Sequence, residues 1–151
     1  MMRRLLAIVG IIALWPATAT AQRLDLSITP SSFSFPSADP DTTPVVLSPV
    51  LTIRYRVQQN AGAQWRITVL ANGDLVSGPA AIPIASVSWI ASPSPPFQEG
   101  TLSSTVEQLV ASGTDNVNPA RTGSITFRLV NLWTYPAGVY SQSFVFTISA
   151  P

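Results

Sequence analysis

The chain has 151 residues and contains no cysteine, histidine or lysine, so its only cationic side chains are eight arginines, against seven acidic residues. These absences exclude cysteine nucleophiles, serine–histidine triads, the usual zinc sites and lysine chemistry. No basic patch is apparent along the sequence, which argues against nucleic acid as a partner.

The first 21 residues have the pattern of a signal peptide. Arg3 and Arg4 precede an apolar run, Leu5 to Trp15, that is too short to span a membrane. Ala19-Thr20-Ala21 supplies the small residues that signal peptidase accepts. We therefore expect residues 1–21 to be removed and residues 22–151 to form one domain that is secreted to the periplasm or cell surface, without membrane insertion after cleavage. That domain carries six arginines and seven acids, a net charge of −1.

Alternating apolar and polar residues predict strands through the first half of the domain. The first strand carries Leu24, Leu26 and Ile28 on one face, and a shorter piece follows at residues 33–35 before a loop at 36–44. Residues 51–57 and 65–71 have the same pattern and are predicted to form an antiparallel hairpin. The sequence Asn72-Gly73-Asp74 then predicts a tight turn.

The second half is less regular until its end. A strand is predicted over 82–89 with Ile84 inward, then a proline-rich break at 92–96. Residues 101–111 fit a strand or a capped helix, and we favour the strand; residues 112–122 are predicted as a polar loop. Residues 125–129 alternate again, and a turn at 135–138 leads to a last strand.

About seven or eight short strands without a convincing helix predict an all-β fold, an immunoglobulin-like antiparallel β-sandwich. Its core is expected to hold residues from the in-phase faces of four strands: Leu51, Ile53, Tyr55, Trp65, Ile67, Val69, Ile125, Phe127, Phe144 and Phe146.

The segment Tyr135-Pro136-Ala137-Gly138-Val139-Tyr140, followed by an alternating strand, resembles the end of spore coat U-type domains, which are secreted β-sandwich subunits linked to chaperone–usher pili. Gly138 is the fourteenth residue from the C-terminus, as in chaperone–usher pilins, although Ala150 stands where those proteins usually have tyrosine. With Trp65 opening an earlier strand, the ending is also similar to WxL-type surface domains. The resemblance implies self-association or contact with other surface subunits, and a periplasmic chaperone as a further partner.

These observations predict a non-enzymatic structural or adhesive surface subunit, assembled by strand addition. The last strand has no charge from Val139 to Ser149, so it is either an edge that accepts a partner or a central strand already paired on both sides. The N-terminal strand is the better donor, with Pro30 as a hinge. The candidate residues for strand addition are Leu24, Leu26, Ile28, Gly138, Tyr140, Phe144, Phe146 and Ile148.

The main alternative is a carbohydrate-binding module in which Trp133 and Tyr135 form an exposed aromatic platform beside a turn. Two further alternatives are a glycosidase using Glu99 and Glu107, and a calcium site at Asp39-Pro40-Asp41 or at residues 115–118. Both have a simpler explanation in solvated charges and turn-forming side chains. We therefore expect no catalytic residue, no metal and no cofactor.

Overall fold

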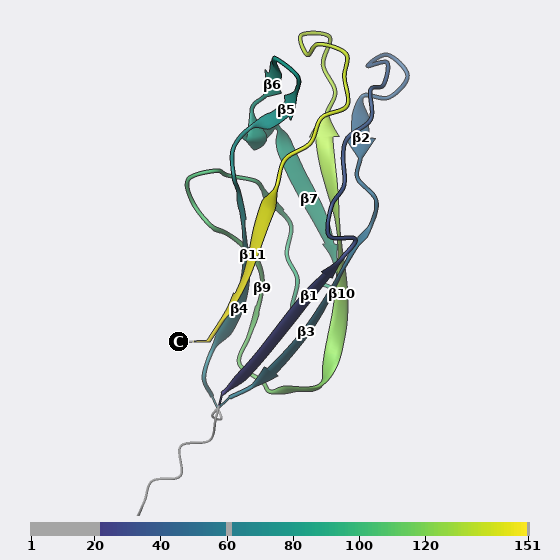
Figure 1. The fold of residues 1–151 in the computed structure, drawn as a ribbon. Coiled ribbons are helices and arrows are strands. Elements are labelled where there is room, and N and C mark those ends of the chain that lie inside the picture. The colour runs from purple at the N-terminus through teal and green to yellow at the C-terminus, as the bar shows by residue number, and fades with distance from the viewer. Residues whose placement is uncertain (1–21, 60–61, 151) are drawn as a thin grey trace, which may run out of the picture.

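The computed structural model describes residues 22–59 and 62–150, which form two antiparallel sheets packed face to face (Figure 1). The larger sheet contains β1 (Arg23–Thr29), β2 (Val45–Leu47), β3 (Leu51–Gln58), β7 (Val87–Ser92), β8 (Gly100–Thr101) and β10 (Val117–Val130). The smaller sheet contains β4 (Trp65–Ala71), β9 (Gln108–Gly113) and β11 (Phe144–Ser149). A separate ribbon pairs β5 (Leu75–Ser77) with β6 (Ala80–Ile82). The predicted all-β sandwich is confirmed, with more strands than expected because several are only two or three residues long.

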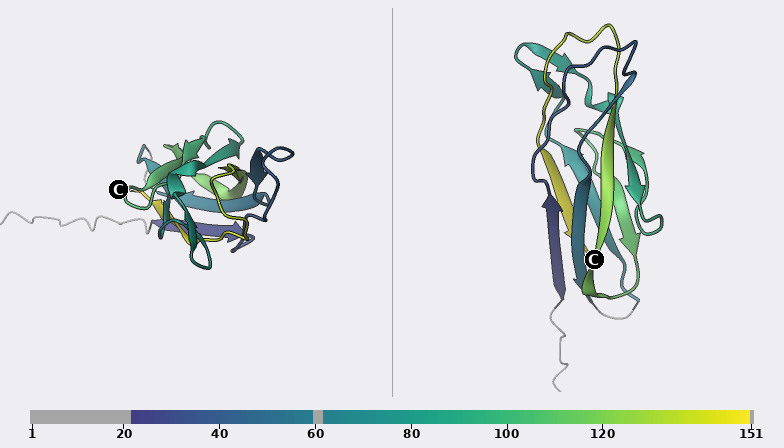
Figure 2. Two further views of the ribbon diagram at one scale, coloured as in Figure 1. Left: turned by 90° about the horizontal axis from the view of Figure 1, so that it is seen from above. Right: turned by 90° about the vertical axis from the view of Figure 1, so that its right-hand side faces the viewer.

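The molecule is elongated, and its two ends differ (Figures 1 and 2). We call the end where β1 begins and β11 ends the base. We call the opposite end, which carries β5, β6 and the loops 36–44 and 131–143, the tip. The predicted signal peptide lies outside the described residues.

The larger sheet has the order β1-β3-β10-β7-β8, with β2 also paired to β10. Its regular alternation sets which face is inward: in β3, Ile53 and Val57 are fully buried, whereas Thr52 and Arg54 are exposed. The smaller sheet has the order β11-β4-β9 and turns its own apolar face toward the same core. Each sheet thus buries one side against the other, which is the arrangement that period-two patterns favour.

The expected core is largely confirmed. Eight of the ten predicted residues are buried, from Leu51 on β3 to Phe127 on β10. The other two, Phe144 and Phe146, pack against the core but are only half-buried. This difference arises because β11 lies at an edge of its sheet.

The hairpin predicted between residues 51–57 and 65–71 is wrong, because β3 and β4 belong to different sheets. Tyr55 and Trp65 meet across the core instead, with ring centroids 5.2 Å apart. Period-two alternation gives the buried face of a strand but not the sheet that the strand joins. For the same reason, residues 72–74 do not form a hairpin turn: they lead from β4 to β5, which do not pair.

Three other predicted boundaries differ. The strand predicted at 82–89 is interrupted by a 3₁₀ turn, η1 (Ile84–Ser86), although Ile84 does point inward. Within 101–111, Ser103 Oγ accepts hydrogen bonds from the backbone of the next residues, so the cap-like sequence forms a turn between β8 and β9. The polar loop predicted at 112–122 is mostly strand, because β10 begins at the buried Val117 and accommodates Pro119 in a bulge.

Candidate strand-addition site

The two terminal strands lie side by side along one side of the sandwich, and each is an edge strand. β1 pairs only with β3, and β11 pairs only with β4. Among the described residues no backbone hydrogen bond joins β1 to β11; the Gln22 side chain donates to the Ala150 carbonyl at 3.0 Å near the base. Both strands therefore keep one row of backbone N–H and C=O groups without a strand partner.

A row of incompletely buried apolar side chains lines this open edge. On the central strands the inward side chains are sealed: Val57, Ile67 and Phe127 are each 0% exposed. Along the two edge strands every inward apolar side chain packs on the core yet stays half-buried. We define the open edge by these side chains: Leu24, Leu26 and Ile28 of β1, Phe33 beside them, and Phe144, Phe146 and Ile148 of β11.

The open edge is hollowed toward the tip. A cavity of about 540 Å³ lies there, lined by Leu26, Ile28, Phe33, Phe144 and Phe146 among others. Phe33 stacks on Phe144 with ring centroids 5.3 Å apart and on Phe127 at 5.2 Å, so the floor of the cavity is aromatic. Sequence reasoning identified Phe33 only as part of a short strand; its spacing of two residues from the fully buried Phe35 was the signal that both rings face the core.

Charge is distributed unequally between the two edge strands. β1 carries Arg23 and Asp25, which form an exposed ion pair at 2.9 Å on its outward face. β11 carries no charge, and its outward Val145 is 48% exposed. Natural edge strands are usually protected by charge or proline, and β11 has neither. Because β11 pairs only with β4, the last strand is an edge strand, and the alternative of a central strand paired on both sides is wrong.

The opposite side of the sandwich is closed, and the proline-rich segment closes it. The Gln98 backbone N–H donates to the Val110 carbonyl at 2.9 Å, and the Ser112 N–H donates to the Pro96 carbonyl at 3.3 Å. Phe97 is buried between the sheets, and the Trp89 indole donates to the Gln98 carbonyl at 2.9 Å. The segment after residue 92 thus covers the outer edge of β9, a role that its prolines alone did not predict. Only one side of the described sandwich is left open.

Two of the predicted strand-addition residues lie elsewhere. Tyr140 is buried at the tip, where its backbone pairs with Phe35 and its hydroxyl donates to the Pro136 carbonyl at 2.7 Å. Gly138 packs against the Ser77 side chain in the loop before it. Both residues line a tip cavity rather than the open edge, because regular pairing of the last strand begins only at Phe144.

The predicted carbohydrate residues line the same tip cavity, of about 570 Å³. Trp133 is 70% exposed, and its indole N–H donates to Asp41 at 3.1 Å. Tyr135 is half-buried, with its hydroxyl 3.0 Å from Ser86 Oγ. The two rings therefore do not form a pair of exposed platforms: Trp133 alone presents an open ring.

The remaining acidic and amide candidates serve local structure. Asp115 pairs with Arg121 at 3.4 Å, Asn116 accepts the Gln59 backbone N–H, and Glu107 accepts the Thr68 hydroxyl. Among the residues that the structure describes, no group of three or more potential ligands is close enough to hold a metal ion. Nor does the described part contain a helix long and apolar enough to cross a membrane.

No protein-family model matches the chain, and comparisons with curated proteins and with solved structures return no match. The function of the chain must therefore be inferred from the chemistry of its open edge and its tip.

Proposed function

We propose that this protein is a secreted, non-enzymatic surface subunit that assembles by strand addition at its open edge. One observation carries the proposal: a sandwich closed on one side leaves a continuous, half-buried apolar row along the free edges of two strands on the other. A β-strand from a neighbouring subunit would satisfy the free backbone groups and cover the apolar row with alternate side chains.

The two edge strands suit different roles. β11 is uncharged and borders the aromatic cavity, which favours it as the acceptor. β1 pairs on one side only and carries the charged pair Arg23–Asp25, which disfavours further pairing on its free edge. β1 follows the predicted cleavage site directly, so it is the natural donor: release from β3 would free seven residues to pair with the β11 edge of a neighbour.

The direct test compares two lysine substitutions at matched positions. Val145 on β11 and Val130 on β10 are both outward valines, 48% and 46% exposed, but β10 is flanked by strands on both sides. In high salt, where contacts between exposed charges are screened, Val145→Lys should abolish multimers of the protein starting at Gln22, because a lysine on an edge strand blocks pairing, whereas Val130→Lys should leave them intact. Size-exclusion chromatography with light scattering measures the multimers formed by each variant. A strict monomer at high concentration without any substitution would falsify the proposal.

A second candidate function is carbohydrate binding at the tip, favoured by the exposed ring of Trp133 above a cavity that also contains Asp39 and Tyr135. A glycan array should show binding that Trp133→Ala removes. Leu132→Ala is the matched control, since Leu132 is an exposed neighbour at 45% that does not line the cavity. Equal binding by both variants, or none by the unaltered protein, would rule this candidate out.

A further inference from the structure

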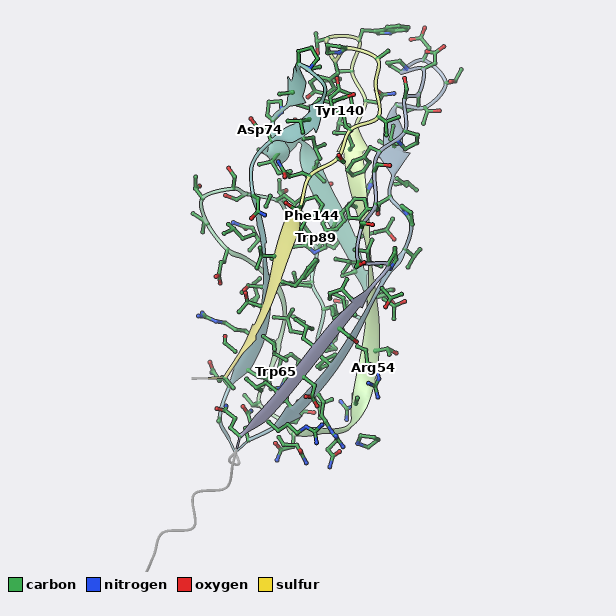
Figure 3. The ribbon with its side chains drawn as sticks, viewed as in Figure 1. Arg54, Trp65, Asp74, Trp89, Tyr140 and Phe144 are labelled. Atoms are coloured by element: carbon green, nitrogen blue, oxygen red, sulfur yellow. The ribbon has the colours of Figure 1, made fainter. Side chains whose placement is uncertain are left out.

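The folded domain separates its charges along its length, although the sequence scatters them. Five arginines lie toward the base with two acids among them, which gives that half a net charge of +3; the residues are Arg23, Arg54, Arg56, Arg66 and Arg121, with Asp25 and Asp115. Three acids lie on the segments at the tip, a net charge of −3 there: Asp39, Asp41 and Asp74; Arg128 lies below them on β10, two residues before that strand ends. Figure 3 shows Arg54 toward the base and Asp74 toward the tip.

These charges are available to a partner. The Arg54 side chain is exposed and has no hydrogen bond or ion pair with another described residue. At the tip, Asp41 is exposed and accepts a single side-chain hydrogen bond, from Trp133. Within one molecule the two ends cannot neutralise each other, because β10 alone spans roughly 46 Å at about 3.3 Å per residue, several times the Debye length of about 8 Å at physiological ionic strength.

We propose that the base binds the tip of a second copy of this chain, so that subunits associate head to tail. The observation that selects this occupant is the charge complementarity of the two ends, +3 against −3, on a chain whose net charge after residue 21 is only −1. A contact between two different surfaces of one protein does not close on itself unless the rotation forms a ring, so it produces a chain of subunits. The inference rests on the proposed function, because it gives the direction in which the proposed assembly grows.

The first test is charge reversal with matched controls. Arg54→Glu at the base and Asp41→Lys at the tip should each weaken self-association about tenfold in sedimentation velocity at low salt, since each places like charges in contact. Arg128→Glu makes the same charge change as Arg54→Glu but leaves the base unaltered, because Arg128 lies near the tip end of β10, and Glu99→Lys matches Asp41→Lys on an exposed residue outside the tip loops; neither should weaken association. Adding salt should weaken association of the unaltered protein, because exposed charges are screened.

The decisive test is a mixture. Arg54→Glu protein mixed with Asp41→Lys protein should recover association, because every contact between unlike copies then joins either the unaltered base to the unaltered tip or the new glutamate to the new lysine. Failure to recover, or equal loss in the Arg128→Glu control, would overturn the inference. So would retention of the base on a heparin column with self-association unaffected by Arg54→Glu, which would assign the arginines to a polyanion instead.

Including Val145→Lys separates this inference from the proposed function. Multimers that survive Arg54→Glu but not Val145→Lys would uphold strand addition and overturn head-to-tail docking. Multimers that survive Val145→Lys but not Arg54→Glu would uphold head-to-tail docking and overturn strand addition.

Discussion

Three phenylalanine rings connect the open edge to the core. Phe33 stacks on Phe127 and on Phe144, and Phe127 stacks on Phe144 at 5.3 Å. Phe127 is fully buried, whereas the other two rings are half-buried and face the cavity. Offset stacking of this kind contributes beyond simple burial. A phenylalanine ring therefore contributes differently to the stability of the fold at each of the three positions.

The loss in the free energy of unfolding when each ring is truncated should increase with the burial of that ring. Phe127→Ala should lower the free energy of unfolding by about 3–5 kcal/mol, because it leaves a cavity in a sealed core. Phe144→Ala should cost less, because water already reaches one side of the ring, and Val145→Ala, outward on the same strand, should cost almost nothing. Urea denaturation measures all three. A larger loss for Phe144→Ala than for Phe127→Ala would contradict the register of β11.

Tyr55 introduces a pH dependence at alkaline pH. Desolvation by burial raises its pKa above the ordinary value of 10.0; Arg121 opposes the shift and Asp115 adds to it. Because the folded state holds the phenol proton more tightly, the stabilisation is fully present below about pH 10 and is lost as pH rises through the higher folded pKa.

Thermal unfolding followed between pH 8.5 and pH 11.5 should therefore show a decline that begins near pH 10. Tyr55→Phe should flatten that decline while leaving neutral-pH stability nearly unchanged, since the ring keeps its contact with Trp65. An equally steep decline in Tyr55→Phe protein would assign the effect to another group.

At the scale of elements, β1 and β11 are distinguished by what they lack. Each has one paired and one free edge, and the two strands lie side by side without a shared ladder. Donor and acceptor roles can therefore be removed separately. Removing residues 22–29 deletes the donor and keeps the β11 edge, whereas Val145→Lys blocks the acceptor and keeps β1.

A mixture of these two variants gives a specific expectation. In high salt, where end contacts are screened, neither should form multimers alone, but together they should form a single heterodimer, with the β1 strand of the Val145→Lys protein added to the β11 edge of the shortened protein. Light scattering identifies the dimer, and circular dichroism of the shortened protein confirms that it retains β-structure. Loss of that β-structure would show that β1 is an integral strand and not a transferable one.

Much of the fold was predictable because alternation is local. The patterns of Leu24 to Ile28 and of Phe144 to Ile148 gave both strands and their inward faces correctly. Their meeting at one open edge was not predictable, because pairing depends on contacts more than a hundred residues apart. The same limit explains the wrong hairpin between β3 and β4 and the unexpected covering of β9 by the segment around Phe97.

At the scale of the whole molecule, the sandwich has one closed side, one open side and two oppositely charged ends. These features are independent of one another: edge pairing would extend a sheet, whereas end contacts would align subunits lengthwise. An assembly that uses both would be a polar fibre whose edge contacts resist salt and whose end contacts do not.

A fibre of this kind should respond to salt in two steps. In high salt the multimers should persist but become smaller in sedimentation velocity, because end contacts weaken while backbone hydrogen bonds remain. With Val145→Lys, by contrast, any residual association should disappear entirely in high salt. Salt-resistant multimers of Val145→Lys protein would be inconsistent with this two-contact description.

The pairing of β11 with β4 also has a consequence for biosynthesis. β4 is the middle strand of the smaller sheet, and one of its neighbours begins only at Phe144, 79 positions after Trp65 and close to the end of the chain. A ribosome makes β4 seconds before it makes β11 at typical rates of about 5–20 residues per second. Throughout that interval the nascent chain holds Trp65, Ile67 and Val69 on a strand that lacks one neighbour, so the smaller sheet stays incomplete until residues 144–149 have been made, and until then the chain is a substrate for any factor that shields unpaired strands.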